Sequence, residues 1–350
     1  MEDCPAQRLH VRELSEEERT KLEEDINVIS DFKQNKLELE AKKNWDLFYK
    51  RNTTKFFKDR HWTTREFEEL TSSCDNSDDH AESRRRVIFE VGCGVGNFMF
   101  PLLEEDPHTY FYACDFSPRA VDFVKSNPLY NSDRCTAFPC DITQDDITAT
   151  VPPACVDITT LIFVLSAIHP EKMVQAIENV AKTLKPGGVL LIRDYGLYDY
   201  AMLRFSKGHK LSENFYVRQD GTRAFYFSLE KLNSIMSQAG LLQIQSSYIE
   251  RATVNKKEGI HVPRIFVQGK YRKASSAGDV LGTSDRHSDS NTSMESSRPP
   301  GCADSCESDK LSVCSPSSGL STVNGTVGAE DISSVVENLT LHSNADADDR

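Results

Sequence analysis

Short apolar runs alternate with amphipathic stretches over the middle of the chain. The runs have the length of β-strands, and the stretches between them repeat apolar residues at helical spacing. The run at 157–164 is almost continuously apolar, as in a parallel strand that is covered on both faces. The pattern predicts strands at 87–91, 110–115, 135–139, 157–164 and 189–193, and helices at 98–105, 118–126 and 172–184. This order is typical of an α/β domain with a mostly parallel sheet.

The alternation breaks after residue 195. The stretch 198–227 is rich in aromatic and basic residues and contains Asp220-Gly221, which predicts an inserted β-hairpin. A helix at 229–239 and strands at 243–250 and 264–271 are predicted to follow. We therefore expect a seven-stranded sheet, apart from the hairpin, in a domain that covers 87–273.

The two flanking segments differ from this domain. Residues 1–86 are predicted to form an extension that is helical over 1–50, where Ser15 and Glu18 have capping-box spacing. Of the chain's 54 acidic and 41 basic residues, 13 and 4 fall within 276–350, together with 17 serines and no aromatic residue. Such a composition cannot offset the entropy of ordering the chain. Residues 274–350 are therefore predicted to be a disordered acidic tail.

Several classes of protein are excluded by composition. The longest apolar run, 161–168, is much shorter than the about 20 residues that span a membrane, so no membrane partner is expected. The start of the chain has no signal-peptide core, and its ten cysteines are expected to be reduced. The expected location is the cytoplasm, with the nucleus as an additional one. Cys302 and Cys306 lack a second ligand pair, so we predict no metal site.

A glycine-rich loop follows the first predicted strand of the domain. Glu90 precedes glycines at 92, 94 and 96, and glycine permits both a tight turn and the close approach of a ligand. Asp115 ends the next strand 23 residues after Gly92, close to the roughly 20 residues expected for an acceptor of ribose hydroxyls. Asp141 follows the third strand, where it suits a purine amine. The alternative is a structural turn with two solvated acids.

The loop also restricts the type of nucleotide-like ligand. No Gly-Lys-Ser/Thr follows the glycines, so they do not form a phosphate-binding loop, and a dinucleotide site would require Gly-x-Gly-x-x-Gly. Glu90 would be unfavourable next to a pyrophosphate. S-adenosylmethionine has no phosphate, and its sulfonium favours aromatic faces. We therefore predict this cofactor, bound by the loop residues Glu90, Gly92 and Gly94 with Asp115 and Asp141.

Six motifs resemble those of the eukaryotic tRNA 3-methylcytidine methyltransferases of the methyltransferase-like group. They are residues 43–50, 57–62, 90–97, 113–117, 163–170 and 193–196, within a resemblance that covers about residues 12–273. The resemblance implies a class I, Rossmann-like methyltransferase that forms 3-methylcytidine in the anticodon loop of tRNA, often serine tRNA. It also implies seryl-tRNA synthetase as an auxiliary partner.

The resemblance further implies roles for single residues. Trp45 and Tyr49, four positions apart on a predicted helix, would close over the cofactor, although an aromatic pair at this spacing also suits core packing. The other implied contacts are Gly92 with the methionine part, Asp115 with the ribose, Asp141 and Ile142 with the adenine, and Ile162 with the ring face or the methyl end.

The segment 55–65 interleaves basic and aromatic residues. Such a surface can neutralise phosphates and stack exposed bases, which suits an RNA loop better than a duplex. We predict that Lys58, Arg60 and Arg65 hold phosphates and that Trp62 stacks a base or braces the segment, with His61 beside it. The alternative is an amphipathic segment whose aromatic residues are buried.

Candidate catalytic residues lie at the end of the fifth predicted strand. Cytidine N3 carries a lone pair, so methyl transfer needs alignment more than deprotonation. Asp194 is predicted to contact the exocyclic amine, and Tyr195 to stack against the base or orient it. His169 is expected to brace its loop and not to act as a base.

Two other functions remain open on the sequence. One is a methyltransferase for small molecules or proteins, which would not need the basic and aromatic segment 55–65. The other is a catalytically silent binding module, which the intact Glu90, Gly92, Asp115 and Asp141 argue against.

Overall fold

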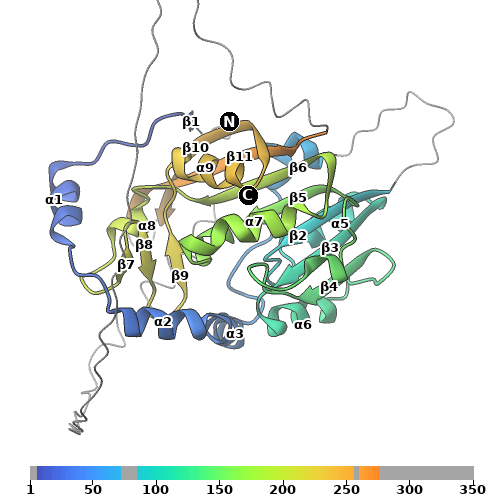
Figure 1. Cartoon of the computed structure of the whole chain (residues 1–350), viewed down its shortest axis with the longest axis horizontal. Helices are drawn as coiled ribbons and strands as arrows, with labels where there is room; N and C mark the ends of the chain where they lie inside the picture. The colour runs from blue at the N-terminus through green and yellow to red at the C-terminus, as the bar shows by residue number, and fades with distance from the viewer. Residues whose placement is uncertain (1–5, 72–84, 256–259, 276–350) are drawn as a thin grey trace, which may run out of the picture.

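A mixed eight-stranded sheet lies at the centre of the protein, in a computed structural model that describes residues 6–71, 85–255 and 260–275 (Figure 1). The predicted acidic tail beyond residue 275 lies outside the described residues. The strand order is β1-β10-β11-β6-β5-β2-β3-β4. Strands β2 to β6 are mutually parallel where they pair, and β11 runs antiparallel to its neighbours β6 and β10.

All seven predicted strands are present. They are β2 (Arg86–Val91), β3 (Thr109–Asp115), β4 (Cys135–Pro139), β5 (Val156–Ile162), β6 (Leu184–Tyr195), β10 (Leu241–Asn255) and β11 (Ile260–Lys273). The eighth strand, β1 (Ala6–Arg8), was not predicted, because three residues carry no readable apolar pattern. It pairs with β10, and the Arg8 guanidinium lies 2.9 Å from the Glu250 carboxylate. The sheet therefore has eight strands instead of seven.

Helices cover both faces of the sheet, because alternate side chains of each strand point to opposite sides. Phe89 packs into the core cluster that contains α7 (Met173–Ala181) and α9 (Leu229–Gln238). Ile88, which precedes Phe89 in β2, packs into the cluster that contains α5 (Met99–Glu105) and α6 (Pro118–Ser126) on the other face. None of the helices in the described ranges is long and apolar enough to cross a membrane.

The inserted hairpin is confirmed as part of a small three-stranded sheet. Its strands are β7 (Lys210–Ser212), β8 (Phe215–Val217) and β9 (Arg223–Phe225), and α8 (Tyr200–Leu203) precedes them. The predicted turn lies between β8 and β9, where Gly221 has a φ of +82° and the Asp220 carboxylate accepts a hydrogen bond from the Thr222 N–H at 2.9 Å. Glycine is favoured at this φ because it has no Cβ.

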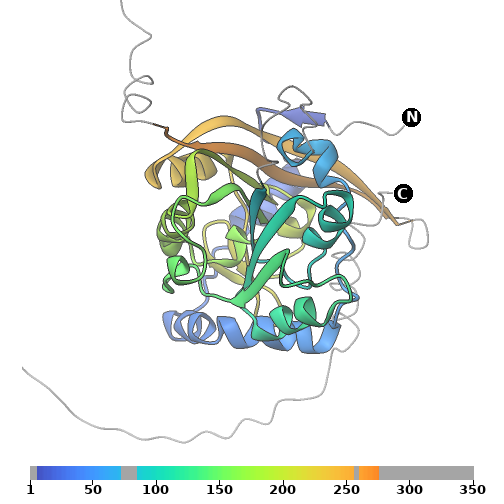
Figure 2. The ribbon, with the colours of Figure 1, turned by 90° about the vertical axis from the view of Figure 1, so that its right-hand side faces the viewer.

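The N-terminal extension is mainly helical, as predicted. It contains α1 (Glu16–Glu24), α2 (Asp31–Leu39), α3 (Ala41–Asn52), α4 (Thr63–Glu66) and the 3₁₀ turn η1 (Glu68–Leu70). Ser15 and Glu18 form the predicted capping box at the start of α1. Figures 1 and 2 show α2 and α3 along one side of the molecule, from the small sheet to α6. The extension thus spans the insertion and the main domain.

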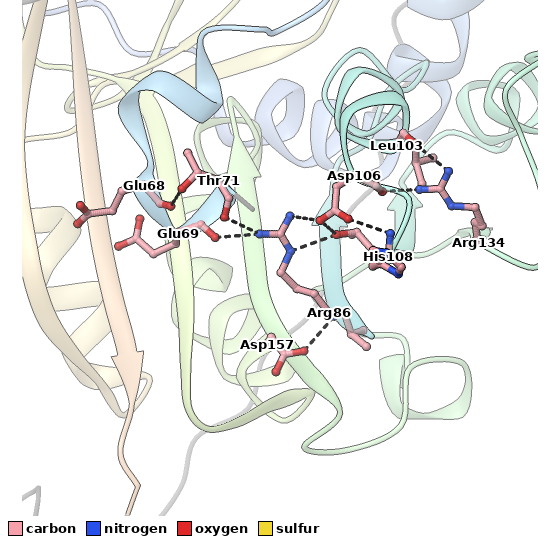
Figure 3. A network of polar contacts seen from close by, with 11 residues as sticks. Glu68, Glu69, Thr71, Arg86, Leu103, Asp106, His108, Arg134 and Asp157 are labelled. Carbon is pink, nitrogen blue, oxygen red and sulfur yellow. Dashed lines mark hydrogen bonds and ion pairs between the residues drawn. The ribbon is translucent and has the colours of Figure 1, made fainter. Parts of the chain in front are cut away.

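A polar network holds β2 to Glu69 and Thr71 at the end of the sheet where the parallel strands begin (Figure 3). The Arg86 guanidinium donates to the carbonyl oxygens of Glu69 and Thr71 at 3.3 and 3.2 Å and pairs with Asp106 at 2.7 Å. The Val87 N–H donates to the Asp157 carboxylate at 2.9 Å. This end of the sheet is therefore structural, and the opposite end is available for ligands.

The chain changes direction across the sheet between β2 and β5. From β2 it passes to β3 and β4 on one side, and β5 and β6 lie on the other. A crevice forms outside the carboxyl ends of parallel strands at such a switch point, and ligands bind there. The 3₁₀ turns η3 (Leu165–Ala167) and η4 (Pro170–Lys172) follow β5 at this end. The remaining 3₁₀ turn is η2 (Ile147–Ala149).

Candidate functional site

The glycine loop between β2 and α5 forms a tight cradle. Gly92 and Gly94 have φ values of +65° and +55°, which other residues rarely adopt. A Cβ on Gly92 would lie 2.4 Å from a methyl group of Val164, and a Cβ on Gly94 would lie 3.0 Å from the Tyr49 hydroxyl. Side chains at these two positions would therefore fill the space that the loop leaves open.

A cavity of about 410 Å³ opens above this loop, at the switch point of the sheet. Eight of the nine predicted cofactor residues line it. These are Trp45, Tyr49, Gly92, Gly94, Asp115, Asp141, Ile142 and Ile162. They come from α3, the glycine loop and the carboxyl ends of three strands, so the structure brings together residues that lie up to 117 positions apart. We call this space the first cavity.

Glu90 is the predicted cofactor residue that does not line the first cavity. It lies beneath the loop, almost fully buried, and its Oε2 atom has no hydrogen-bond partner. Burial raises the pKa of Glu90 to about 8, a shift that the Arg60 charge partly opposes. The structure places the Glu90 side chain outside the cavity wall, and its contact with the cofactor stays a prediction.

Asp115 is held in place by the loop that it faces. One carboxylate oxygen accepts from the Gly94 N–H and the other from the Ser117 N–H, both at 2.9 Å. Burial raises the pKa of Asp115 to about 6, although these hydrogen bonds favour the ionised form. Asp141 is similarly engaged, since it accepts from the N–H and hydroxyl of Thr143 at 3.0 and 2.7 Å. Both acids are thus preorganised at the cavity wall.

Helix α3 lies over the first cavity as a cover. Trp45 and Tyr49 line the cavity, with their ring centroids 6.3 Å apart. Asp46 fastens the helix to α6, because its carboxylate accepts from the Ser117 hydroxyl at 2.9 Å and pairs with Arg119 at 3.1 Å. The Asn44 amide donates to the Gly221 carbonyl of the hairpin at 3.1 Å. The aromatic pair therefore belongs to a cover held by polar contacts at two points.

The two predicted catalytic residues, Asp194 and Tyr195, lie in different environments in the structure. Asp194 is fully buried and is not part of the cavity wall, and its carboxylate oxygens accept from the Ser166 and Tyr195 N–H groups, each at 2.9 Å. The contact of Asp194 with the substrate amine therefore stays a prediction that the cavity lining does not support. Tyr195 lines the cavity, with its ring 5.1 Å from Phe163. His169 accepts from the Glu171 N–H at 3.4 Å, as expected for a bracing role.

The predicted RNA-binding segment is divided between surface and interior. The Lys58, His61 and Arg65 side chains are exposed, so they stay candidates for phosphate contacts. Trp62 is only 7% exposed, and the Arg193 guanidinium lies 4.1 Å from its ring centroid. The structure therefore favours the bracing role of Trp62 over the stacking of a base, because the ring is covered.

The position of Arg60 also differs from the prediction that the segment 55–65 forms an RNA-binding surface. Its side chain is 9% exposed and lines the first cavity, and its guanidinium donates to the Ile162 carbonyl at 3.3 Å. A side chain in this position does not belong to an outward phosphate-binding surface. The segment turns this side chain inward beside the glycine loop, so the structure does not support the predicted phosphate contact of Arg60.

Sequence reasoning missed Phe163, which follows β5. It has a φ of +61°, lines the first cavity and packs against Tyr195 and Phe266. A positive φ at an aromatic residue costs on the order of 1–3 kcal/mol and is concentrated at functional sites. No local signal in the sequence predicts this conformation.

A second cavity of about 390 Å³ adjoins the first. Trp45, Phe57, Tyr195 and Arg218 line both. The second cavity is rich in aromatic residues and arginines, among them Phe56, Tyr200, Phe205, Tyr226, Arg204 and Arg264. Arg264 is 3% exposed and pairs with Asp199 at 2.9 Å, and its Nη2 atom has no hydrogen-bond partner. No group of three or more metal-binding side chains exists within the ranges that the structure describes.

The first cavity fits S-adenosylmethionine. A Cβ at either loop glycine would fill the cradle, a buried carboxylate faces the cavity from β3, and an aromatic pair covers it. When bound, the cofactor supplies a methyl group on a positively charged sulfur, which aromatic faces stabilise. The fold and this site together define a class I S-adenosylmethionine-dependent methyltransferase.

Comparisons with known proteins narrow the class further. A methyltransferase-domain family model matches residues 89–190. The human tRNA N(3)-cytidine methyltransferase METTL6 is 57% identical over 265 residues, which are 76% of this chain and 92% of that protein. The tRNA N(3)-methylcytidine methyltransferase trm141 of Schizosaccharomyces pombe is 43% identical over 71% of this chain and 98% of its own length. The chain therefore belongs to the tRNA N(3)-cytidine methyltransferases, as the six motifs indicated.

One solved structure with a similar fold shares much less sequence with this chain. An S-adenosylmethionine-dependent methyltransferase from Anabaena variabilis aligns over 67% of this chain and 95% of its own, with 12% identity and a TM-score of 0.48.

Proposed function

We propose that the protein methylates N3 of a cytidine in the anticodon loop of tRNA, with serine tRNA as its main substrate, and that the cytidine base enters the second cavity. The named relatives are methyltransferases that act on N3 of cytidine in tRNA. The observation that carries the proposal for this chain is the pair of adjoining cavities, which meet at Tyr195.

The lining of the second cavity supports a nucleotide as its occupant. Unpaired bases are recognised by stacking on aromatic rings and arginine planes, and arginines also contact phosphates. The Arg218 guanidinium lies 5.6 Å from the Tyr195 ring centroid, and the Arg204 guanidinium lies 5.7 Å from the Tyr200 ring centroid. A base within a duplex cannot reach a cavity of this kind without leaving the stack, whereas a loop nucleotide leaves it at lower cost. This favours an anticodon loop over a stem.

Orientation is the main chemical task of the site. The N3 atom of neutral cytidine carries the attacking lone pair, so no base is needed to activate it. Tyr195 lies where the two cavities meet and is suited to hold the ring plane of the base. The methylated ring carries a positive charge, which the aromatic walls stabilise.

The outer surface supports a large anionic substrate. Exposed basic side chains lie on α2 and α3, beside the cavities. They are Lys33, Lys36, Lys42, Lys43, Lys50 and Arg51. Such side chains position a phosphate backbone without reading its sequence. They cannot select one tRNA by themselves, so we propose that seryl-tRNA synthetase assists recognition of serine tRNA. We also propose that the enzyme acts in the cytoplasm and, in addition, in the nucleus.

Mass spectrometry of nucleosides tests the proposal. The full chain is incubated with isotope-labelled cofactor and single purified tRNAs, with and without seryl-tRNA synthetase. We expect labelled 3-methylcytidine in serine tRNA, and loss of the label when the target anticodon-loop cytidine is replaced by uridine. Label in another nucleoside, or equal labelling of all tRNAs with the synthetase present, would overturn the assignment.

A matched pair of variants tests the second cavity. Arg204→Gln removes a cation from its wall, and Lys231→Gln removes an exposed cation from α9. We expect the first variant to raise KM for tRNA about tenfold, with unchanged cofactor affinity, and the second to change neither. An unchanged KM in Arg204→Gln would place the base elsewhere.

A further inference from the structure

Arg60 is a buried cation at the wall of the first cavity, and no carboxylate among the described residues forms an ion pair with it. Its backbone N–H donates to the Asn97 carbonyl at 2.8 Å, which fixes the residue beside the glycine loop. Its guanidinium donates to the Ile162 carbonyl and lies 5.7 Å from the ring centroid of Phe163, while Nε has no hydrogen-bond partner. An unpaired guanidinium in such a place is unfavourable until a negative group reaches it.

The charges around Arg60 do not compensate it. Glu90 lies close enough to feel its charge but forms no ion pair with it, and burial raises the pKa of Glu90 to about 8, so this carboxyl group is mainly neutral near pH 7. Two of the other four Lys and Arg side chains that line the cavity differ in this respect. Lys172 and Arg223 both pair with Glu38. The described residues thus leave Arg60 available to an anionic group of a ligand.

The order of the strands indicates which part of the cofactor would meet Arg60. Asp115 ends β3, and Asp141 and Ile142 follow β4, so the predicted ribose and adenine contacts lie on one side of the glycine loop of β2. Arg60 contacts Ile162 at the end of β5, on the other side of β2. A cofactor whose nucleoside lies over β3 and β4 extends its amino-acid end across the loop toward β5.

We propose that Arg60 binds the α-carboxylate of the methionine part of S-adenosylmethionine and so fixes the end of the cofactor that carries the methyl group. This inference rests on the predicted placement of ribose and adenine, and it replaces an RNA contact for the same residue. Guanidinium groups match carboxylates in geometry and form charge-assisted hydrogen bonds. Arg60 is therefore a cofactor-positioning residue.

A binding cycle with two ligands and two proteins tests the contact directly. Calorimetry measures S-adenosylhomocysteine and its decarboxylated analogue, which lacks only the carboxylate, against the full chain and against Arg60→Gln. We expect the unaltered chain to prefer the carboxylated ligand about 10- to 100-fold, and Arg60→Gln to lose this preference while it binds the analogue as before. Equal weakening of both ligands would show a purely structural role and overturn the proposal.

Controls separate this result from folding and from the proposed function. Lys58→Ala, two positions away and exposed, should keep the full preference, and Arg60→Lys should keep part of it because the charge remains. Unchanged tRNA affinity in Arg60→Gln supports the proposal, whereas reduced tRNA affinity with unchanged S-adenosylhomocysteine binding would return Arg60 to RNA recognition. The calorimetry contains no tRNA, so its result for Arg60 does not depend on which nucleotide the enzyme methylates.

Discussion

Lowering the pH from 7 to 5 is expected to weaken cofactor binding about tenfold, through the protonation of Asp115. Burial raises the pKa of this carboxyl group to about 6 from its ordinary 3.8. Only the ionised carboxylate accepts hydrogen bonds from both ribose hydroxyls. About nine in ten free molecules are ionised at pH 7 and about one in ten at pH 5, and the apparent Kd rises in inverse proportion to that fraction.

The stability of the cofactor-free protein should change in the opposite direction. A carboxyl group whose folded pKa lies above its unfolded pKa favours folding below the unfolded value, and this contribution is lost as the pH rises through the folded value. For Asp115 the window runs from about 3.8 to about 6. Relative to Asp115→Asn, which does not titrate, the unaltered chain should lose about 3 kcal/mol of unfolding free energy across this window.

Calorimetry with S-adenosylhomocysteine between pH 5 and pH 7 measures the binding effect. The Asp115→Asn profile should be flat, and Glu90→Gln should keep the profile of the unaltered chain, because the pKa of Glu90 is about 8 and it stays protonated throughout this range. A flat profile in the unaltered chain would refute the reasoning. So would a tenfold dependence that survives in Asp115→Asn.

Two further predictions concern site candidates that the structure buries. Trp62→Ala should lower the unfolding free energy by about 3–5 kcal/mol, because the ring is buried against Arg193, whereas Lys58→Ala should change it by less than about 0.5 kcal/mol; urea titration compares them. Asp194→Asn should cost about 1–3 kcal/mol in the same assay, since the amide cannot accept from both the Ser166 and Tyr195 N–H groups. Full stability with lost methyl transfer in Asp194→Asn would restore its catalytic role.

Much of the fold could be predicted because each strand carries its own signal. The apolar runs and the turn at Asp220-Gly221 are local, and they located seven strands and the hairpin. The strand β1 has three residues, too few for any periodic pattern, and it exists because β10 extends far enough to pair with it. Its presence is therefore a consequence of tertiary pairing.

The lining of the first cavity was predictable for a related reason. Parallel strands present their carboxyl ends at one edge of the sheet, so Gly92, Asp115 and Asp141 meet there once the strands are placed. Phe163 was not predictable, because its positive φ depends on packing against Tyr195 and Phe266 from two other strands. A single sequence does not record such a constraint.

The segment 55–65 shows why charge and aromatic content alone do not identify a surface. Trp62 is buried because Arg193 lies over its ring, and Arg193 is itself paired with Glu66, the residue that follows this segment. Glu66 also pairs with Arg251 of β10 at 2.5 Å. The segment is thus clamped to β6 and β10 by ion pairs between residues up to 185 positions apart, which turns Trp62 inward. The same chain path carries Arg60 into the cavity, so the segment buries two of the residues that were predicted to bind RNA.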